Sequence, residues 1–138
     1  MLVVINILIA DDYLPFRHVL RDFMETADSR LQVVAEAANG REALSLLKKH
    51  RVHIALIDIR MPLMDGIELT RCIRQEFGGR VVIITYTGLR SPRLMAQALQ
   101  AGADLHLVKP FELFALKNAV IRLAGSAKKV PKETASVG

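Results

Sequence analysis

Short apolar runs recur along the chain, separated by longer segments in which apolar residues repeat at helical spacing. The runs are rich in Val and Ile and nearly continuous, as is typical of strands covered on both faces of a parallel sheet. Five of them predict strands at residues 3–10, 31–37, 54–57, 80–86 and 105–108. Strands that alternate with helical segments indicate an α/β fold, here a doubly wound five-stranded parallel sheet.

The segments between the strands carry start signals for helices. Asn39 and Glu42 have the spacing of a capping box, and Pro15 suits the first turn of a helix that ends near Ala27. Further candidate N-cap residues are Asp65 and Ser91. The last helix is predicted over residues 112–123, where leucine and valine recur at helical spacing.

The length of 138 residues suits one domain with a buried core and is too short for two ordinary domains. With 51% hydrophobic and 24% charged residues and a mean hydropathy of +0.28, the composition is that of a folded globule. We expect the domain to cover residues 1–124. Residues 125–138, which lack an apolar period, are expected to form a disordered basic tail.

The net charge of +5 raises the question of nucleic-acid binding. Basic residues are dispersed except near the end of the chain, at Lys117, Arg122, Lys128, Lys129 and Lys132. We interpret that group as a solvated tail, with an acidic partner as the alternative, and expect no direct contact with nucleic acid. Cys72 is the only cysteine and no apolar stretch is long enough to span a membrane, so a cytoplasmic location is expected.

Polar residues follow or end four of the five predicted strands. In doubly wound sheets, ligands bind beyond the carboxyl ends of the strands, where the winding direction reverses. The residues expected to meet there are Asp11, Asp12, Asp58, Thr87 and Lys109. Five polar groups at one sheet edge predict a functional site.

Three carboxylates at this edge suit Mg²⁺, which prefers oxygen ligands and takes only one or two carboxylates directly. Asp12 and Asp58 could bind it directly, and Asp11 could act through a water molecule. Clustered carboxylates repel one another. We therefore expect Mg²⁺ to stabilise the fold.

The same residues could support phosphoryl transfer. If Asp58 is a nucleophile toward phosphorus, the metal and Lys109 would offset charge on the phosphoryl oxygens, and Thr87 would donate a hydrogen bond. Each residue also has an ordinary explanation. Asp58 could cap a loop, Lys109 could pair with Asp12, and Thr87 could be a strand-end threonine.

Several short motifs, taken together and in order, resemble those of one protein family. They are ADD after the first strand, DIRMPLMDG after the third, a Thr ending the fourth, AGAD before the fifth and KPF after it. This set resembles the receiver domain of two-component response regulators over about residues 4–123. The resemblance implies a (βα)5 flavodoxin-like fold with strand order 2-1-3-4-5.

Residue by residue, the resemblance implies that Asp58 is the phosphoacceptor, served by a sensor histidine kinase or a histidine phosphotransfer protein. Thr87 would be the switch hydroxyl, and Lys109 would balance the phosphoryl charge. The implied Mg²⁺ ligands are Asp11, Asp12, Asp58 and the backbone carbonyl of Arg60. The implied loop-shaping residues are Pro62, Gly66 and Pro110, and the bond before Pro110 is often cis in this family.

Two assignments leave alternatives open, the switch hydroxyl and the role of His106. Thr85 lies two residues before Thr87, so both side chains point to one face of the strand and either could be the switch hydroxyl. His106 stands where many receivers carry Tyr or Phe. It could fill the same space as a small aromatic residue or make the output face sensitive to pH. Arg60 and Leu89 stand at positions that, in the family the chain resembles, influence phosphoryl lifetime, and we expect slow to moderate decay.

The leading functional hypothesis is a phosphorylation-dependent signalling switch, not an enzyme beyond self-catalysed transfer to Asp58 and hydrolysis there. Its output face would be built by the fourth helix, fifth strand and fifth helix, which could also form a homodimer. It would control a partner or an effector domain outside this chain. The alternatives are a receiver-like binding module that acts without phosphorylation, a phosphohydrolase and a flavin carrier. Arg60 in place of a second acid argues against the phosphohydrolase. The TYTG segment follows the fourth strand rather than the first, which argues against the flavin carrier.

Overall fold

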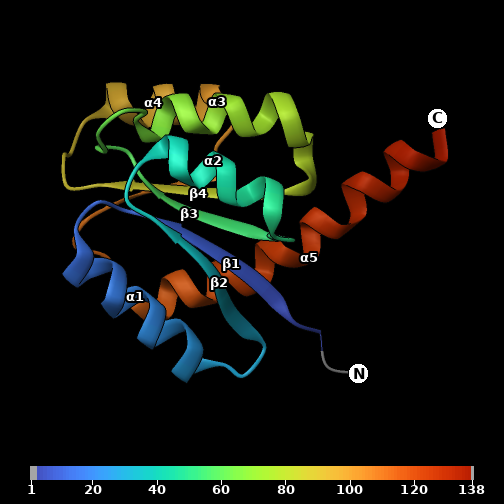
Figure 1. Ribbon diagram of the computed structural model, residues 1–138, viewed down its shortest axis with the longest axis horizontal. Coiled ribbons are helices and arrows are strands. Elements are labelled where there is room, and N and C mark those ends of the chain that lie inside the picture. The colour runs from blue at the N-terminus through green and yellow to red at the C-terminus, as the bar shows by residue number, and fades with distance from the viewer. Residues whose placement is uncertain (1–2, 138) are drawn as a thin grey trace.

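One parallel sheet of five strands forms the centre of the protein. The computed structural model describes the backbone of residues 3–137 and the side chains of residues 3–125. The strands are β1 (Ile5–Ala10), β2 (Leu31–Ala37), β3 (Ile54–Asp58), β4 (Val82–Thr87) and β5 (Leu105–Val108). They lie in the order β2-β1-β3-β4-β5, all parallel, so the predicted doubly wound fold is confirmed (Figure 1).

Helices cover both faces of this sheet. They are α1 (Leu14–Ala27), α2 (Gly40–Lys49), α3 (Gly66–Phe77), α4 (Pro92–Ala101) and α5 (Leu113–Val137), with the short 3-10 helix η1 (Gly78–Arg80) after α3. In Figure 1, α1 and α5 lie on one side of the sheet and α2, α3 and α4 on the other. The result is a three-layer sandwich with helix layers outside.

Alternate residues of each central strand point into two separate apolar layers. Ile7 and Ile9 pack with residues of α1 and α5, whereas Leu8 and Ala10 pack with residues of α2 and α3. All four are fully buried. Burial on both faces explains why the strands are continuous apolar runs in the sequence.

Three of the predicted helix starts, those of α2, α3 and α4, are confirmed by side-chain hydrogen bonds. The Asn39 carboxamide oxygen accepts from the Glu42 N–H at 2.8 Å, and the Glu42 carboxylate accepts from the Ala38 N–H at 2.7 Å. In a capping box, this carboxylate accepts from the N–H of the N-cap residue. Here it accepts from Ala38, the residue before the N-cap residue Asn39. The caps of α3 and α4 are Asp65, which accepts from the Glu68 N–H, and Ser91, which accepts from the Leu94 N–H.

Replacing Asn39 with Ala is expected to lower the free energy of unfolding by about 1 kcal/mol, because one N–H of the first turn of α2 loses its acceptor. Urea denaturation would measure this. Asn118 is an exposed residue within α5, and Asn118→Ala is the matched control. The control is expected to stabilise the protein by about 0.5 kcal/mol through helix propensity. Equal changes in both variants would exclude a capping role for Asn39.

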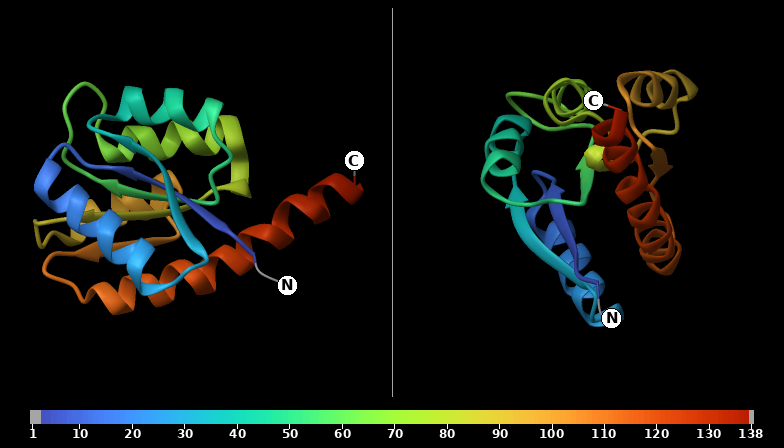
Figure 2. Two further views of the ribbon diagram at one scale, coloured as in Figure 1. Left: turned by 60° about the horizontal axis from the view of Figure 1, so that its bottom comes forward. Right: turned by 90° about the vertical axis from the view of Figure 1, so that its right-hand side faces the viewer.

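The last helix is longer than the sequence predicts. Its expected end at Leu123 is wrong, because α5 continues to Val137 and extends away from the sheet (Figure 2). Ala127, Lys128 and Lys129 are good helix formers that prolong an existing helix at little cost. The side chains of residues 126–138 lie outside the described residues, and the assignment of residues 125–138 to a separate tail stays a prediction.

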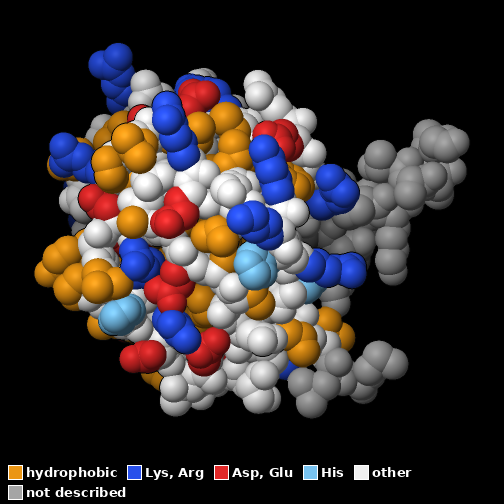
Figure 3. Space-filling view, viewed as in Figure 1, with side chains coloured by type: hydrophobic (Ala, Val, Ile, Leu, Met, Phe, Trp, Pro, Cys, Tyr) orange, Lys and Arg blue, Asp and Glu red, His pale blue; other side chains and the backbone are white. Residues whose placement is uncertain are grey.

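Charges on the surface are mixed in sign. On the face in Figure 3, Lys and Arg side chains are interspersed with Asp and Glu. This agrees with the dispersed basic residues of the sequence. Within the described part of the chain, no helix combines the length and the apolar character needed to cross a bilayer.

Candidate functional site

The carboxyl ends of the parallel strands bring the predicted site residues to one edge of the sheet. Asp11 and Asp12 follow β1, and Asp58 is the last residue of β3. Thr87 ends β4, and Lys109 follows β5 directly. β3 and β4 therefore extend one residue beyond their predicted ends, so that Asp58 and Thr87 belong to the strands.

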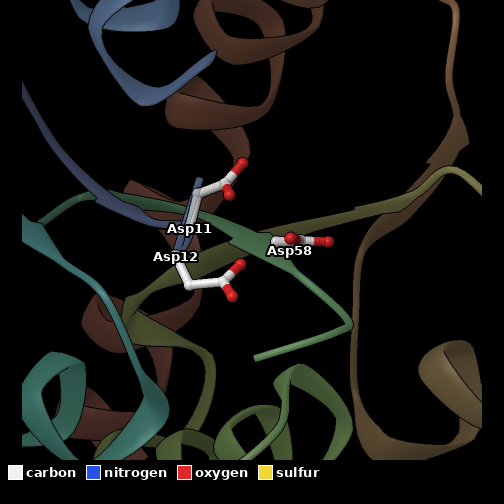
Figure 4. Close-up of side chains that lie close together, drawn as sticks. All are labelled: Asp11, Asp12 and Asp58. Carbon is white, nitrogen blue, oxygen red and sulfur yellow. The ribbon is translucent and has the colours of Figure 1, made fainter. Parts of the chain in front are cut away.

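Three carboxylates converge at this edge. Each of Asp11, Asp12 and Asp58 offers an oxygen, and these three oxygens lie within 4.8 Å of one another (Figure 4). Asp11 is buried, Asp58 is half-buried and Asp12 is exposed. The donor set consists of carboxylate oxygens with one side open to water, which fits the preference of Mg²⁺ for oxygen ligands and retained waters.

Asp11 is held in place by two hydrogen bonds to its side chain. One carboxylate oxygen accepts from the Tyr13 N–H at 2.8 Å, and the other accepts from the Tyr86 hydroxyl at 2.5 Å. Burial and the nearby charge of Asp11 raise the pKa of Tyr86 well above its usual value, so the hydroxyl stays protonated and donates. The guanidinium of Arg17 donates to the Asp11 carbonyl at 2.6 Å.

Asp58 has an unusual acidity. Burial raises its pKa to about 7, and the negative charge of Asp11 adds to this effect. The Arg60 N–H, 3.4 Å from the Asp58 carboxylate, and the charge of Lys109 act in the opposite direction. In the metal-free protein, the carboxyl of Asp58 is therefore partly protonated near neutral pH.

The ammonium group of Lys109 lies over two aromatic rings. Its Nζ lies 3.8 Å from the ring centroid of Phe16 and 5.2 Å from that of Tyr86. Lys109 takes part in none of the ion pairs found within 4.0 Å among the described residues, so the pairing with Asp12 that the sequence allowed is not formed. Its charge still lowers the pKa of Asp58.

The two candidate switch threonines have different partners. The Thr85 hydroxyl shares a 2.8 Å hydrogen bond with Nδ1 of His106 on the neighbouring strand β5. The Thr87 hydroxyl accepts from the Leu89 N–H at 3.2 Å, in the loop that follows β4. This difference supports Thr87 as the switch hydroxyl, an assignment that stays a prediction.

His106 is a buried residue, with 8% of its surface exposed. Its Nε2 atom has no hydrogen-bond partner among the described residues, and burial lowers the pKa of the imidazole. The neutral ring is therefore favoured at neutral pH. This agrees with the interpretation of His106 as a small aromatic residue, and a pH-sensitive output face stays a prediction.

The loop after β3 approaches the sheet closely. A Cβ atom on Gly66 would lie 2.4 Å from the carbonyl oxygen of Asp58, so only glycine fits there. The Lys109-Pro110 peptide bond is cis, as the resemblance implies. Beside the carboxylates lies an open groove of about 650 Å³, whose lining includes Asp12, Arg60, Pro62, Leu89 and Leu94.

Sequence reasoning missed the residues behind the carboxylates, namely Tyr86, Phe16 and Arg17. Tyr86 precedes Thr87 in the strand, so its side chain points to the opposite face of the sheet from both candidate threonines. A tyrosine inside an otherwise aliphatic run is the one signal in the sequence, because a buried phenol needs a hydrogen-bond partner.

The chain is similar to known proteins over most of its length. The family model described as response regulator receiver domain matches residues 7–121. The chemotaxis protein CheY of Halobacterium salinarum is 34% identical over 115 residues, which cover 83% of this chain and 92% of that protein.

Solved structures agree with this match. The signal receiver domain of the response regulator NarL from Mycobacterium tuberculosis superimposes with a TM-score of 0.81 at 30% identity, covering 89% of this chain and 98% of that one. A chain in the CheX-CheY-BeF3-Mg²⁺ complex from Borrelia burgdorferi has a TM-score of 0.78 at 28% identity, covering 88% and 90%.

Proposed function

The chain belongs to the family of response regulator receiver domains, and on that premise we propose that it is a signalling switch in which Asp58 accepts a phosphoryl group. The observation that carries this proposal is the convergence of the oxygens of Asp11, Asp12 and Asp58 within 4.8 Å. Lys109 lies near enough to lower the pKa of Asp58. The proposed donor is a sensor histidine kinase or a histidine phosphotransfer protein.

Mg²⁺ would be held by the carboxylates of Asp11, Asp12 and Asp58 and by the backbone carbonyl of Arg60. The Mg²⁺ in the Borrelia burgdorferi complex supports this choice of metal. When bound, the ion supplies positive charge that offsets the negative charge of the phosphoryl oxygens.

The residues of the chain have distinct roles in the transfer. A carboxylate oxygen of Asp58 forms the new bond to phosphorus, while the bond to the imidazole nitrogen of the donor breaks and that nitrogen keeps the electron pair. Only ionised Asp58 can attack. With a pKa of about 7 in the metal-free state, lower pH removes the nucleophile. Lys109 balances the added charge, and the Thr87 hydroxyl donates to a phosphoryl oxygen.

The output of the switch would be a shift in the population of the α4, β5 and α5 surface, which could control a partner, an effector domain or a homodimer. The buried hydrogen bond between Thr85 and His106 joins β4 to β5 beneath α4 and supports this surface as the responsive one. A cytoplasmic location stays a prediction.

The test is incubation of the protein with Mg²⁺ and a small acyl phosphate, followed by intact-mass spectrometry. The wild type is expected to gain the mass of one phosphoryl group, and Asp58→Asn is expected to gain none. Asp22 is an exposed aspartate of α1, and Asp22→Asn is the matched control that should behave like the wild type. A folded wild-type protein that gains no mass would contradict the proposal and favour a binding module that acts without phosphorylation.

A further inference from the structure

Three aromatic rings meet on the α1 side of the sheet edge, beneath the candidate site. Phe16 of α1, Tyr86 of β4 and Phe111 of the loop after β5 contact one another edge to face, with centroids 5.6 to 6.3 Å apart. Tyr86 is fully buried. The cluster therefore ties together three elements that are distant in sequence.

The upper surface of this cluster holds the Lys109 ammonium. Its Nζ is 3.8 Å from the Phe16 centroid and 5.2 Å from the Tyr86 centroid, both within the range of a cation–π interaction. No carboxylate of the described residues pairs with Lys109 within 4.0 Å. The rings thus fix the position of this charge.

Tyr86 also contacts the acidic cluster through its hydroxyl. The phenol donates to one Asp11 oxygen at 2.5 Å, while the other Asp11 oxygen accepts from the Tyr13 N–H. Two fixed donors determine the orientation of this carboxylate. A hydrogen bond to a charged acceptor in a buried environment is among the stronger ones in proteins.

We propose that Tyr86 is a positioning residue of the acceptor site, which orients Asp11 through its hydroxyl and holds the Lys109 ammonium against its ring. This inference rests on the proposed function, because it assigns Asp11 to the metal and Lys109 to the phosphoryl group. One side chain thereby fixes a negative and a positive group of the same site before either ligand arrives.

Mg²⁺ affinity tests the role of the hydroxyl. Tyr86→Phe keeps the ring and removes the bond to Asp11, so the dissociation constant for Mg²⁺, measured by titration calorimetry, is expected to rise about three- to tenfold. Tyr13→Phe removes an exposed tyrosine hydroxyl and is the matched control, for which the dissociation constant should not change.

A double-mutant cycle separates positioning from a general loss of structure. In an Asp11→Asn background, Tyr86→Phe is expected to leave the Mg²⁺ dissociation constant unchanged within about twofold. If Tyr86→Phe weakens binding equally in both backgrounds, or does not weaken it in the wild type, the role of the hydroxyl is excluded.

The role of the ring has its own spectroscopic signature. Aromatic ring currents should move the Lys109 Hε protons upfield in the wild type, and Tyr86→Phe should keep that shift. Tyr86→Leu should reduce it. If the Lys109 Hε resonance of Tyr86→Phe coincides with that of Tyr86→Leu, the ring does not hold the ammonium.

Failure of the wild type to bind Mg²⁺ or to accept phosphate would instead overturn the proposed function itself.

Discussion

Asp58→Asn is expected to stabilise the metal-free protein by about 2 kcal/mol at about pH 8, measured by urea denaturation in the presence of a chelator. The folded protein raises the pKa of Asp58 from 3.8 to about 7, chiefly through burial and then through the charge of Asp11. In a fully buried group, a pKa raised this far would lower the free energy of unfolding by about 4 kcal/mol. Because the Asp58 carboxylate is only half-buried, water screens its charge and reduces this destabilisation to about half.

The direction of the pH dependence follows from proton binding. Between pH 3.8 and about 7, the folded state binds more protons at Asp58 than the unfolded state, so the contribution of this residue to stability falls as pH rises. The advantage of Asp58→Asn over the wild type should therefore be smaller at about pH 5 than at about pH 8. Asp22→Asn, an exposed control, should show no such difference.

Magnesium should reverse part of this effect. Because a bound cation removes the repulsion among the carboxylates, saturating Mg²⁺ is expected to stabilise the wild type more than Asp58→Asn. A pH-independent advantage of Asp58→Asn, or none at all, would show that the negative charge of Asp58 does not destabilise the folded protein. Asp58 would then be an ordinary solvated carboxylate.

Gly66→Ala is expected to lower the free energy of unfolding by about 3 kcal/mol. Its Cβ would lie 2.4 Å from the carbonyl oxygen of Asp58 and 2.8 Å from the Cα of Ile59, and neither backbone atom can move without displacing β3. Gly66 also donates its N–H to the Ile59 carbonyl at 2.8 Å, so the start of α3 is fixed against the end of that strand.

The matched control is Gly88→Ala. Gly88 is exposed beside the same site, and a Cβ there would meet no atom within 4 Å. The free energy of unfolding of Gly88→Ala, measured in urea, should stay within about 0.5 kcal/mol of the wild-type value. If both glycine variants unfold at the same urea concentration, the close approach at Gly66 does not constrain the loop.

Much of the fold could be predicted because it depends on local pattern. Continuous apolar runs fixed five strands to within two residues at each end, and the caps at Asn39, Asp65 and Ser91 placed three helix starts. The end of α5 could not be placed in this way. Residues 126–137 have no apolar face that would reveal a helix, and their helical backbone continues one already formed.

The sequence by itself determined which acids meet. Parallel strands carry their carboxyl ends to one edge of the sheet, so Asp11, Asp12 and Asp58 converge wherever β1 and β3 are neighbours. Only the tertiary structure decided what holds them. Tyr86 bonds Asp11 across 75 residues, and Lys109 lies on Phe16 rather than on a carboxylate. Such contacts depend on how α1, β4 and the β5 loop pack in space, which the periodicity of each segment does not specify.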